Sequence, residues 1–358
     1  MNDSLNVLVL FGGASAEHPI SLRSAATVLR ALGQGAHAIT TVGITREGCW
    51  RLGDFSELLT RSETEIVELD PATGAAVTLG NDGAGARLLA LDPAGSADVP
   101  RDPIDVVFPV LHGPGGEDGT VQGFLELLDL PFVGAGSAAS AVAMDKVIMK
   151  AVTEAAGLPQ VDYLFVDRDD NETVARRVRE SFGYPCFVKP ANLGSSVGVT
   201  RAVDDAGLAV SLDEARSHDP RVLVERGVDI REIEIALLGS GPPSFSVPGE
   251  IVSDEGFYDF EAKYVAATAG LEAPARIDAD TLAAMEKIAT EAWSLIGGKG
   301  MARVDFFVDK ASGELYLNEF NTIPGFTEIS MYPRLWRESG LDTPALVEKL
   351  LELAIAGR

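Results

Sequence analysis

Short apolar runs and periodic apolar segments alternate along the first third of the chain. Residues 6–11, NVLVLF, form an apolar run that ends in two glycines, and the following SLRSAATVLRALG has helical periodicity and a final glycine. A strand, a glycine loop and a helix in this order are typical of an α/β unit. Strand-like runs recur at HAITTVGIT and IDVVFPVL, and the second leads through HGPGGEDG into a predicted helix, TVQGFLELLDL.

The pattern of the remaining chain predicts two further lobes. A predicted helix, SAVAMDKVIMKAVTEAAG, precedes the strands DYLFV and PCFVKP, and longer strands such as REIEIALLG, ARVDFFVD and GELYLNEF dominate after residue 222. We therefore expect three lobes of α/β or α+β class, at residues 1–134, 135–224 and 225–358. Residues 53–103 are rich in Gly, Asp, Ala and Pro, and we interpret them as inserted hairpins and loops.

Charge and composition exclude several classes of partner. The net charge of −25 argues against nucleic acid and anionic membranes, because both require an excess of Lys and Arg. The two cysteines, Cys49 and Cys186, form no disulfide framework and have no metal-site spacing. No segment approaches the ~18 apolar residues of a membrane span, and the start lacks the features of a signal peptide. We expect a cytoplasmic protein.

Hard-metal ligands gather on one predicted β-hairpin. The segment ARVDFFVDKASGELYLNEFN reads as two strands joined by a tight turn. Side chains alternate along a strand, so Asp305, Glu319 and Asn321 can converge on one face, beside Arg303. Oxygen ligands without His or Cys suit Mg²⁺ or Mn²⁺. The alternative is a solvent-exposed polar face, which the apolar neighbours of these residues disfavour.

Three glycine-rich loops offer binding sites for charged groups. In VKPANLGSSVGV, Lys189 ends a strand and a Gly/Ser loop follows, a combination that can hold phosphate, although a plain hairpin turn explains it equally well. Glu17 follows the first glycine loop, where it either binds a ligand amine or favours the helix start. His112 begins the loop HGPGGEDG and is either a ligand contact or a loop histidine.

The order of these motifs resembles that of D-alanine–D-alanine ligases. The segments GGASAEHPISL, LHGPGGEDGTVQG, MDK, VKPANLGSSVGV, REIE, FYDFEAKY, ARVDFF and NEFNTIPGFTEISMYP follow one another as they do in that ATP-grasp family. The resemblance covers nearly the whole chain and is weakest over residues 53–103. It implies an N-terminal domain with a doubly wound parallel sheet, followed by a two-lobed ATP-grasp unit that holds ATP between its lobes.

The resemblance also implies roles for individual residues. The phosphates of ATP would be bound by Lys146, Lys189 and Ser195, with Lys263 at the γ-phosphate. Adenine would be bound by Glu225 and by the backbone near Arg226 and Val228. The ribose would be bound by Glu232. Two Mg²⁺ or Mn²⁺ ions would be bound by Asp305, Glu319 and Asn321. The substrate would be bound by Glu17, His112, Ser330 and the Met331 backbone. The catalytic group would be Glu17, Ser195, Tyr264, Arg303 and the Gly325 backbone.

The activity implied by the resemblance is the ATP-dependent joining of two D-alanine molecules through an acylphosphate, for peptidoglycan precursor synthesis. The alternative is another ATP-grasp carboxylate–amine ligase, for example of the D-alanine–D-lactate type, which Tyr264 in EAKY disfavours. A non-catalytic nucleotide-binding protein is disfavoured because the ligand set is complete. Further implied features are a homodimer, a monovalent cation as an additional ligand, and a lid over residues 257–275. Pro19 and Arg226 depart from the usual residues of the family.

Overall fold

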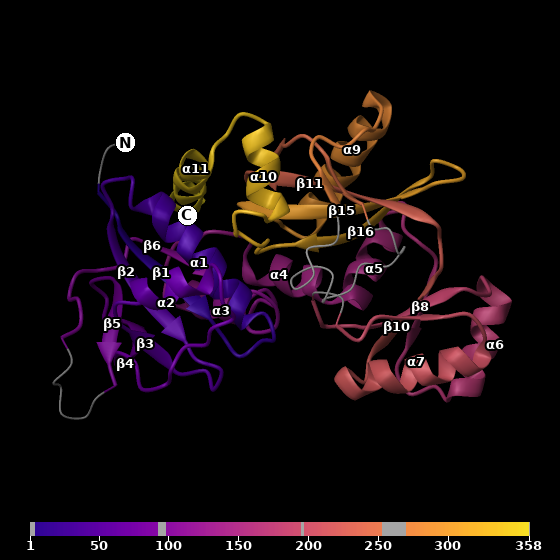
Figure 1. Ribbon diagram of the computed structural model, residues 1–358, viewed down its shortest axis with the longest axis horizontal. Helices are drawn as coiled ribbons and strands as arrows, with labels where there is room; N and C mark the ends of the chain where they lie inside the picture. Colours follow the sequence, from indigo (N-terminus) through magenta and orange to yellow (C-terminus); the bar gives the residue numbers. More distant parts are fainter. Residues whose placement is uncertain (1–3, 92–97, 195–196, 253–269, 358) are drawn as a thin grey trace.

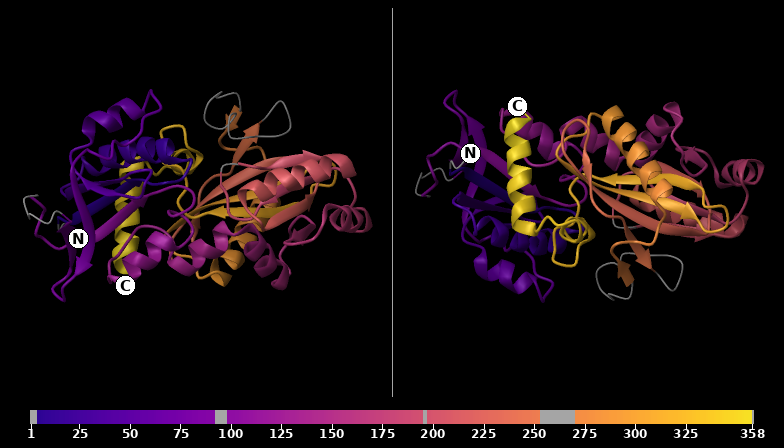
Figure 2. Two further views of the ribbon diagram at one scale, coloured as in Figure 1. Left: turned by 90° about the horizontal axis from the view of Figure 1, so that it is seen from below. Right: turned by 90° about the horizontal axis from the view of Figure 1, so that it is seen from above.

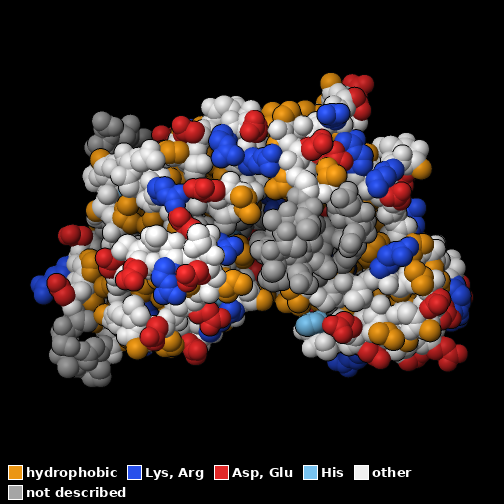
Figure 3. Space-filling model, viewed as in Figure 1, with side chains coloured by type: hydrophobic (Ala, Val, Ile, Leu, Met, Phe, Trp, Pro, Cys, Tyr) orange, Lys and Arg blue, Asp and Glu red, His pale blue; other side chains and the backbone are white. Residues whose placement is uncertain are grey.

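The computed structural model describes residues 4–91, 98–194, 197–252 and 270–357 (Figure 1). Three sheets follow one another along the molecule, and each belongs to a different part of the chain. Acidic and basic side chains are intermixed on the face shown in Figure 3, so the negative net charge is not gathered into one patch there. Among the described helices, none combines the length and the apolar character needed to span a membrane.

The first sheet has a parallel half and an antiparallel half. Its strand order is β5-β4-β3-β2-β1-β6, and β1 pairs in parallel with both β2 and β6. The strands are β1 (Asn6–Gly12), β2 (Ala38–Ile44), β3 (Trp50–Leu52), β4 (Ala75–Asn81), β5 (Ala86–Ala90) and β6 (Val106–Val110). The predicted insertion, residues 53–103, thus supplies the hairpin β4–β5, which extends the sheet by antiparallel pairing.

Helices cover both faces of this sheet, as a doubly wound domain requires. The helices are α1 (His18–Leu32), α2 (Ser56–Ser62) and α3 (Thr120–Leu127). Side chains alternate along β1, so Val9 and Phe11 pack with the core that contains α1 and α2. Leu8 and Leu10 point the other way and pack with the core that contains α3.

The central sheet is small and antiparallel, with the order β7-β10-β8-β9. Its elements are α4 (Ser137–Met144), α5 (Lys146–Ala155), β7 (Tyr163–Val166), α6 (Asn171–Ser181), β8 (Cys186–Pro190), β9 (Thr200–Ala202), α7 (Asp205–His218) and β10 (Val222–Arg226). Helices α6 and α7 share a separate apolar core with this sheet. The expected boundary at residue 224 lies inside β10, so we place the change of lobe in the link at 227–229.

The third sheet has the order β14-β13-β11-β15-β16, with β12 paired to β11. The elements of this part are β11 (Ile230–Leu238), β12 (Ser244–Phe245), β13 (Gly249–Val252), β14 (Gly270–Glu272), α9 (Ala279–Leu295), β15 (Met301–Asp309), β16 (Leu315–Asn321), α10 (Met331–Glu338) and α11 (Thr343–Ala356). The hairpin expected from ARVDFFVDKASGELYLNEFN is the antiparallel pair β15–β16. Helix α9 covers one face of the sheet, and Trp293 of α9 stacks on Phe320 of β16.

The last helix returns to the beginning of the chain. Leu346 and Leu350 of α11 lie in the same apolar core as Val9 of β1, and this core also includes Phe326 and Tyr332 of the C-terminal part. Figure 2 shows α11, in yellow, alongside the N-terminal sheet. The first and third parts of the chain therefore share one continuous apolar core.

Candidate active site

Acidic side chains from three neighbouring strands meet on one face of the third sheet. In register, Asp305 of β15 lies opposite Glu234 of β11 and opposite Glu319 of β16. Arg303 lies opposite Asn321 in the same hairpin. Because directly opposed residues share a face, the period-two spacing seen in the sequence places all five side chains together.

Arg303 is the cation of this group. Its guanidinium donates to both carboxylate oxygens of Asp305, each at 2.7 Å, and Nε lies 3.2 Å from Oε1 of Glu234. Burial alone would lower the pKa of Arg303, but the carboxylates of Asp305 and Glu234 outweigh it and hold the pKa well above the ordinary value. Asn321 also donates to Asp305, with Nδ2 3.0 Å from Oδ2. Arg303 is therefore a permanently charged group with a fixed orientation.

The same face offers oxygen donors for a hard cation. Within the described residues, carboxylate oxygens of Glu232, Glu234 and Asp305 lie within 4.8 Å of one another. Glu319 stands beside them in register, with its Oε2 3.8 Å from the Lys146 ammonium. Carboxylate and amide oxygens with no thiol or imidazole fit Mg²⁺ or Mn²⁺ rather than zinc. Glu234 was not singled out from the sequence, although its spacing of two from Glu232 was a usable signal.

Two lysines of the central part of the chain lie close to residues of the third sheet. Lys189 of β8 forms an ion pair with Glu225 of β10, and its ammonium lies 5.8 Å from the ring centroid of Phe307 on β15. Lys146, the first residue of α5, donates from Nζ to the Leu193 carbonyl at 2.6 Å. Both ammonium groups thus stand beside the loop that follows β8, where phosphate binding was expected from the sequence.

The Arg226 side chain connects the central sheet to the third sheet. Its guanidinium donates to the Tyr316 hydroxyl at 3.2 Å, and Nε lies 3.0 Å from Oδ2 of Asp162. The unusual arginine therefore ties β10 to the hairpin, and any contribution to base binding falls to the backbone of 226–228. Val228 lies in the link between β10 and β11, and Glu232 follows on β11.

Three glycine loops surround the Glu17 carboxylate. A Cβ built on Gly113, whose φ is +75°, would stand 2.6 Å from Oε2 of Glu17, and one built on Gly194 would stand 3.2 Å away. A side chain at either position would displace the carboxylate, so the glycines allow a close backbone approach. Glu17 itself is 8% exposed and immediately precedes α1. The structure thus brings together loops that are about 180 residues apart in sequence.

His112 connects the N-terminal loops to the loop after β16. Its Nδ1 lies 2.9 Å from the Ile323 carbonyl, which requires a proton on Nδ1, and Nε2 lies 2.9 Å from the Ser24 hydroxyl. Ser24 in turn accepts from the backbone N–H of Phe326 at 3.1 Å. Burial lowers the pKa of His112, in keeping with a neutral ring. Both ring nitrogens are therefore engaged within the protein, and the ring holds the segment that contains Gly325.

Glu117 makes a second connection between the same two loops, and it was not singled out from the sequence. Its carboxylate accepts from the backbone N–H of Gly113 at 2.7 Å and of Ile323 at 3.2 Å. Burial, with a smaller contribution from the nearby negative charge of Glu17, raises the pKa of Glu117 to about 8. The carboxyl thus titrates near neutral pH in the folded protein.

The raised pKa of Glu117 predicts a pH-dependent stability. A carboxyl whose pKa is higher in the folded than in the unfolded chain contributes stability below about pH 4.5 and loses it as the pH rises to about 8. We therefore expect Glu117→Gln to be less stable than the wild type at pH 5, by ~1–2 kcal/mol, because the amide replaces one of two acceptor oxygens. Between pH 5 and pH 8 the difference should move by at least ~2 kcal/mol in favour of the variant, so that its deficit disappears or reverses at pH 8.

Urea unfolding of both proteins at pH 5 and pH 8 measures this difference. Glu352→Gln, an exposed substitution on α11, is the matched control and should show the same deficit at both pH values. A constant deficit for Glu117→Gln across this range would contradict the assignment of a raised pKa.

Gly325, Ser330 and Met331 lie together where α10 begins. Ser330 is the residue before α10, and its hydroxyl accepts from the Thr327 N–H at 3.0 Å. A Cβ on Gly325 would stand 2.9 Å from the Ser330 hydroxyl, so these residues form one close turn. Met331 is the first residue of the helix, and the backbone N–H groups at a helix start favour an anionic ligand.

Ser195, Lys263 and Tyr264, and most of the expected lid at 257–275, lie outside the described residues.

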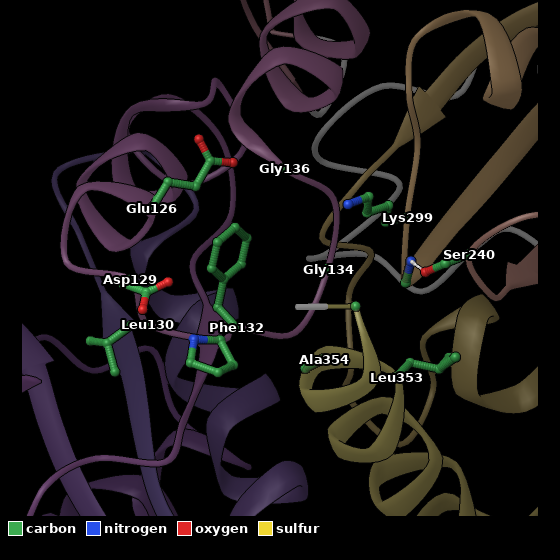
Figure 4. Close-up of a pocket in the computed structure, with 13 residues that line it drawn as sticks. Glu126, Asp129, Leu130, Phe132, Gly134, Gly136, Ser240, Lys299, Leu353 and Ala354 are labelled. Atoms are coloured by element: carbon green, nitrogen blue, oxygen red, sulfur yellow. Dashed lines mark hydrogen bonds between the residues drawn. The ribbon is translucent and has the colours of Figure 1, made fainter. Parts of the chain in front are cut away.

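Two of the cavities formed by the described residues lie at the N-terminal domain, outside this cluster. One, of about 370 Å³, lies beside the first two glycine loops, and Gly13, His112 and Gly115 are among its lining residues. The other, of about 230 Å³, lies where the end of α3, the segment around Gly134 and the end of α11 meet, with Lys299 at its edge (Figure 4). None of the expected site residues lines the second cavity, so we place the candidate site at the carboxylate face.

Similarity to known proteins covers this whole arrangement. The family domain described as D-ala D-ala ligase N-terminus matches residues 6–135, and D-ala D-ala ligase C-terminus matches residues 152–352. The D-alanine–D-alanine ligase of Heliobacterium modesticaldum is 44% identical over 355 residues, which are 98% of this chain and 94% of the relative. The chain belongs to the D-alanine–D-alanine ligase family.

Solved structures agree with the family. The D-alanine-D-alanine ligase from Coxiella burnetii superposes with a TM-score of 0.85 at 35% identity, covering 99% of this chain and 94% of the other. The VanG D-Ala:D-Ser ligase from Enterococcus faecalis superposes with a TM-score of 0.84 at 32% identity, covering 98% of this chain and 100% of the other. The expected ATP-grasp fold is thereby confirmed. As a member of this family the chain is an ATP-dependent ligase that uses a divalent metal ion.

Proposed function

We propose that this protein joins two D-alanine molecules to D-alanyl-D-alanine at the expense of ATP, for peptidoglycan precursor synthesis. The observation that carries the proposal is the meeting of Arg303, Asp305 and Glu319 on one sheet face, in a chain that matches D-alanine–D-alanine ligases over almost its full length. Within this cluster Arg303 is a cation for a developing oxyanion, and the carboxylates of Asp305 and Glu319 are partners for a divalent ion at the phosphoryl group.

ATP would lie between the central and third sheets. Lys146 and Lys189 supply positive charge for its phosphates, and Ser195 and Lys263 are the further phosphate contacts implied by the motifs. The base would lie at Glu225 and the backbone of 226–228, with Glu232 at the ribose. The opposite signs of the lysines and the phosphates support this placement.

Asp305, Glu319 and Asn321 would hold Mg²⁺ or Mn²⁺, in two ions, with Glu234 adjacent. A bound divalent ion neutralises the charge on the phosphoryl group that is transferred. The donor set of carboxylates and one amide supports these metals over Zn²⁺. A monovalent cation remains an expectation, as do a homodimer and a cytoplasmic location.

The chemistry proceeds in two steps. A carboxylate is a poor acyl donor, so a carboxylate oxygen of the first D-alanine attacks the γ-phosphorus of ATP, ADP leaves, and an acylphosphate forms. Glu17 would hold the ammonium of this D-alanine, with Ser195 and Tyr264 in the same hydrogen-bonded cluster. The Glu17 carboxylate lies against the backbone of both Gly113 and Gly194, which supports a small ligand at this point.

The second D-alanine then supplies the nucleophile. Its carboxylate would bind at Ser330 and the Met331 N–H, at the start of α10, and its neutral amine attacks the acyl carbon. Arg303 and the Gly325 N–H offset the negative charge of the tetrahedral oxygen. Phosphate leaves, and the amine loses its proton as the amide forms. His112 and Glu117 would hold the Gly325 segment in place for this step.

The decisive experiment is phosphate release from ATP with candidate amino acids. D-alanine alone should support steady release and yield D-alanyl-D-alanine, whereas L-alanine should not. D-serine and D-lactate, each supplied with D-alanine, test the alternative second substrates, and a strong preference for either would overturn the dipeptide assignment. Release with L-alanine and none with D-alanine would refute the proposed function.

A further inference from the structure

Lys150 is a buried cation that the roles given above leave unexplained. It lies on α5, four residues after Lys146, and only 4% of its surface is exposed. Its Nζ lies 2.7 Å from Oε1 of Glu225 and 3.3 Å from the Val161 carbonyl, and 5.6 Å from the Tyr163 ring centroid. A lysine is seldom buried this deeply unless a partner needs its charge.

Glu225 is held between two ammonium groups. Lys150 contacts Oε1 of the carboxylate and Lys189 contacts Oε2, so each oxygen has its own cation. Glu225 is 3% exposed, and burial alone would raise its pKa, but the two lysines outweigh burial and bring the pKa to about 2. Glu225 is therefore an ionised acceptor at every physiological pH, fixed from both sides.

The two lysines reach Glu225 from different elements. Lys189 stands on β8 opposite Leu223, which places it on the same face of the central sheet as Glu225. Lys150 comes from α5, whose Val147 packs on Leu223 and whose Met149 packs in the core of the third sheet. Figure 1 shows α5 between the central and third sheets. Lys150 thus joins Glu225 of the central sheet to a helix that also packs on the third sheet.

The charges in this trio suggest what Lys150 contributes. With Lys150 in place, the carboxylate is held from α5 and from β8 at the same time, and its oxygens keep lone pairs for one more donor. Without Lys150, the carboxylate would turn toward Lys189 alone, since a buried carboxylate follows its remaining cation. The acceptor would then leave its fixed position beside the base.

We propose that Lys150 is a positioning residue for nucleotide selection, which holds the Glu225 carboxylate as a fixed acceptor for the amino group of adenine. The proposal rests on the proposed function in placing the base of ATP at Glu225. Adenine carries an amino donor where guanine carries an oxygen acceptor. A fixed carboxylate accepts a hydrogen bond from the amino group of adenine and repels the corresponding oxygen of guanine. It therefore discriminates between ATP and GTP.

Calorimetric binding of non-hydrolysable ATP and GTP analogues, in the presence of Mg²⁺ and without amino acid, tests the proposal. Lys150→Met should weaken binding of the ATP analogue by about 10-fold or more and that of the GTP analogue by less than about 3-fold. Lys150→Arg, which keeps the charge, should restore at least part of the preference. Equal weakening of both nucleotides, or no weakening, would overturn the proposal.

A double-mutant cycle separates positioning from a general effect on the fold. In a Glu225→Gln background, Lys150→Met should change the ATP-to-GTP preference by less than about 2-fold, because the residue acts through Glu225. An undiminished effect in that background would show that Lys150 acts otherwise.

Lys349→Met, an exposed substitution on α11, is the control and should leave both affinities at the wild-type values. If Lys150→Met unfolds, the Lys150→Arg and Glu225→Gln affinities decide: an unchanged nucleotide preference in both would overturn the proposal.

Steady-state kinetics distinguishes this proposal from the proposed function. Lys150→Met should raise the KM for ATP by about 10-fold, while kcat at saturating ATP and the KM for D-alanine change by less than about 3-fold. A lowered kcat with an unchanged KM for ATP would contradict a role in nucleotide positioning. If the wild type binds ATP but releases no phosphate with D-alanine, the proposed function fails while the binding test of Lys150 still stands.

Discussion

Replacing Asp305 with asparagine is expected to lower kcat/KM for phosphate release by about 100-fold or more. The carboxylate lies at the centre of the site, opposed by Glu234 and Glu319 and bonded to Arg303 and Asn321. The amide keeps the size of the side chain but removes a full negative charge from the expected metal site. The affinity for the divalent ion should therefore fall together with the rate of phosphoryl transfer.

The metal dependence of the rate checks this expectation. Raising the Mg²⁺ concentration should recover part of the activity of Asp305→Asn, because weakened binding is partly offset by mass action. The fold should persist, since Arg303 keeps its contact with Glu234. Asp213→Asn, an exposed substitution on α7, should retain wild-type kinetics. An Asp305→Asn enzyme with an unchanged Mg²⁺ requirement would remove Asp305 from the metal site.

Replacing Arg303 with methionine is expected to impair both stability and activity. Asp305 and Glu234 are each about 2% exposed at the side chain, so the variant would leave two buried carboxylates without their cation. Breaking a buried pair in this way costs ~3–5 kcal/mol of unfolding free energy. If Arg303 stabilises the tetrahedral oxygen as proposed, its loss should also lower kcat by ~10²–10³-fold.

Arg303→Lys separates these two effects. Lysine restores the charge, so most of the lost unfolding free energy in urea should return at pH 7.5. A lysine ammonium cannot donate in parallel to both oxygens of Asp305 while it also approaches Glu234. We therefore expect kcat to stay at least about 10-fold below the wild type. Wild-type stability of Arg303→Met would show that the two carboxylates do not depend on this arginine.

The hairpin and the convergence of its polar side chains were predictable because their signal is local. Apolar residues at Val304 and Phe306 alternate with Arg303 and Asp305, and this period of two defines both the strand and the face that its polar residues share. The turn between the strands brings Glu319 opposite Asp305 with no information from elsewhere in the chain. The glycine loops were likewise found at the ends of strands.

Pairings between distant strands could not be read from the sequence. Glu234 belongs to the site only because β11 pairs with β15, and nothing in REIEIALLG states that register. In the sequence, Lys150 is one polar position of an amphipathic helix, and its ion pair with Glu225 of β10 is seen only in the structure. The hairpin β4–β5 lies in the segment interpreted as hairpins and loops, but its bounds could not be predicted because only a few positions of β4, such as Val77 and Leu79, are buried.

The return of α11 to the N-terminal sheet has a mechanical consequence. Because the first and last parts of the chain share one apolar core, any separation of these two parts would expose Val9, Phe326 and Leu350 to water. The central sheet has its own core, formed with α6 and α7. If the site opens to admit nucleotide, we therefore expect the central sheet with α6 and α7 to move, while the two ends of the chain stay packed together.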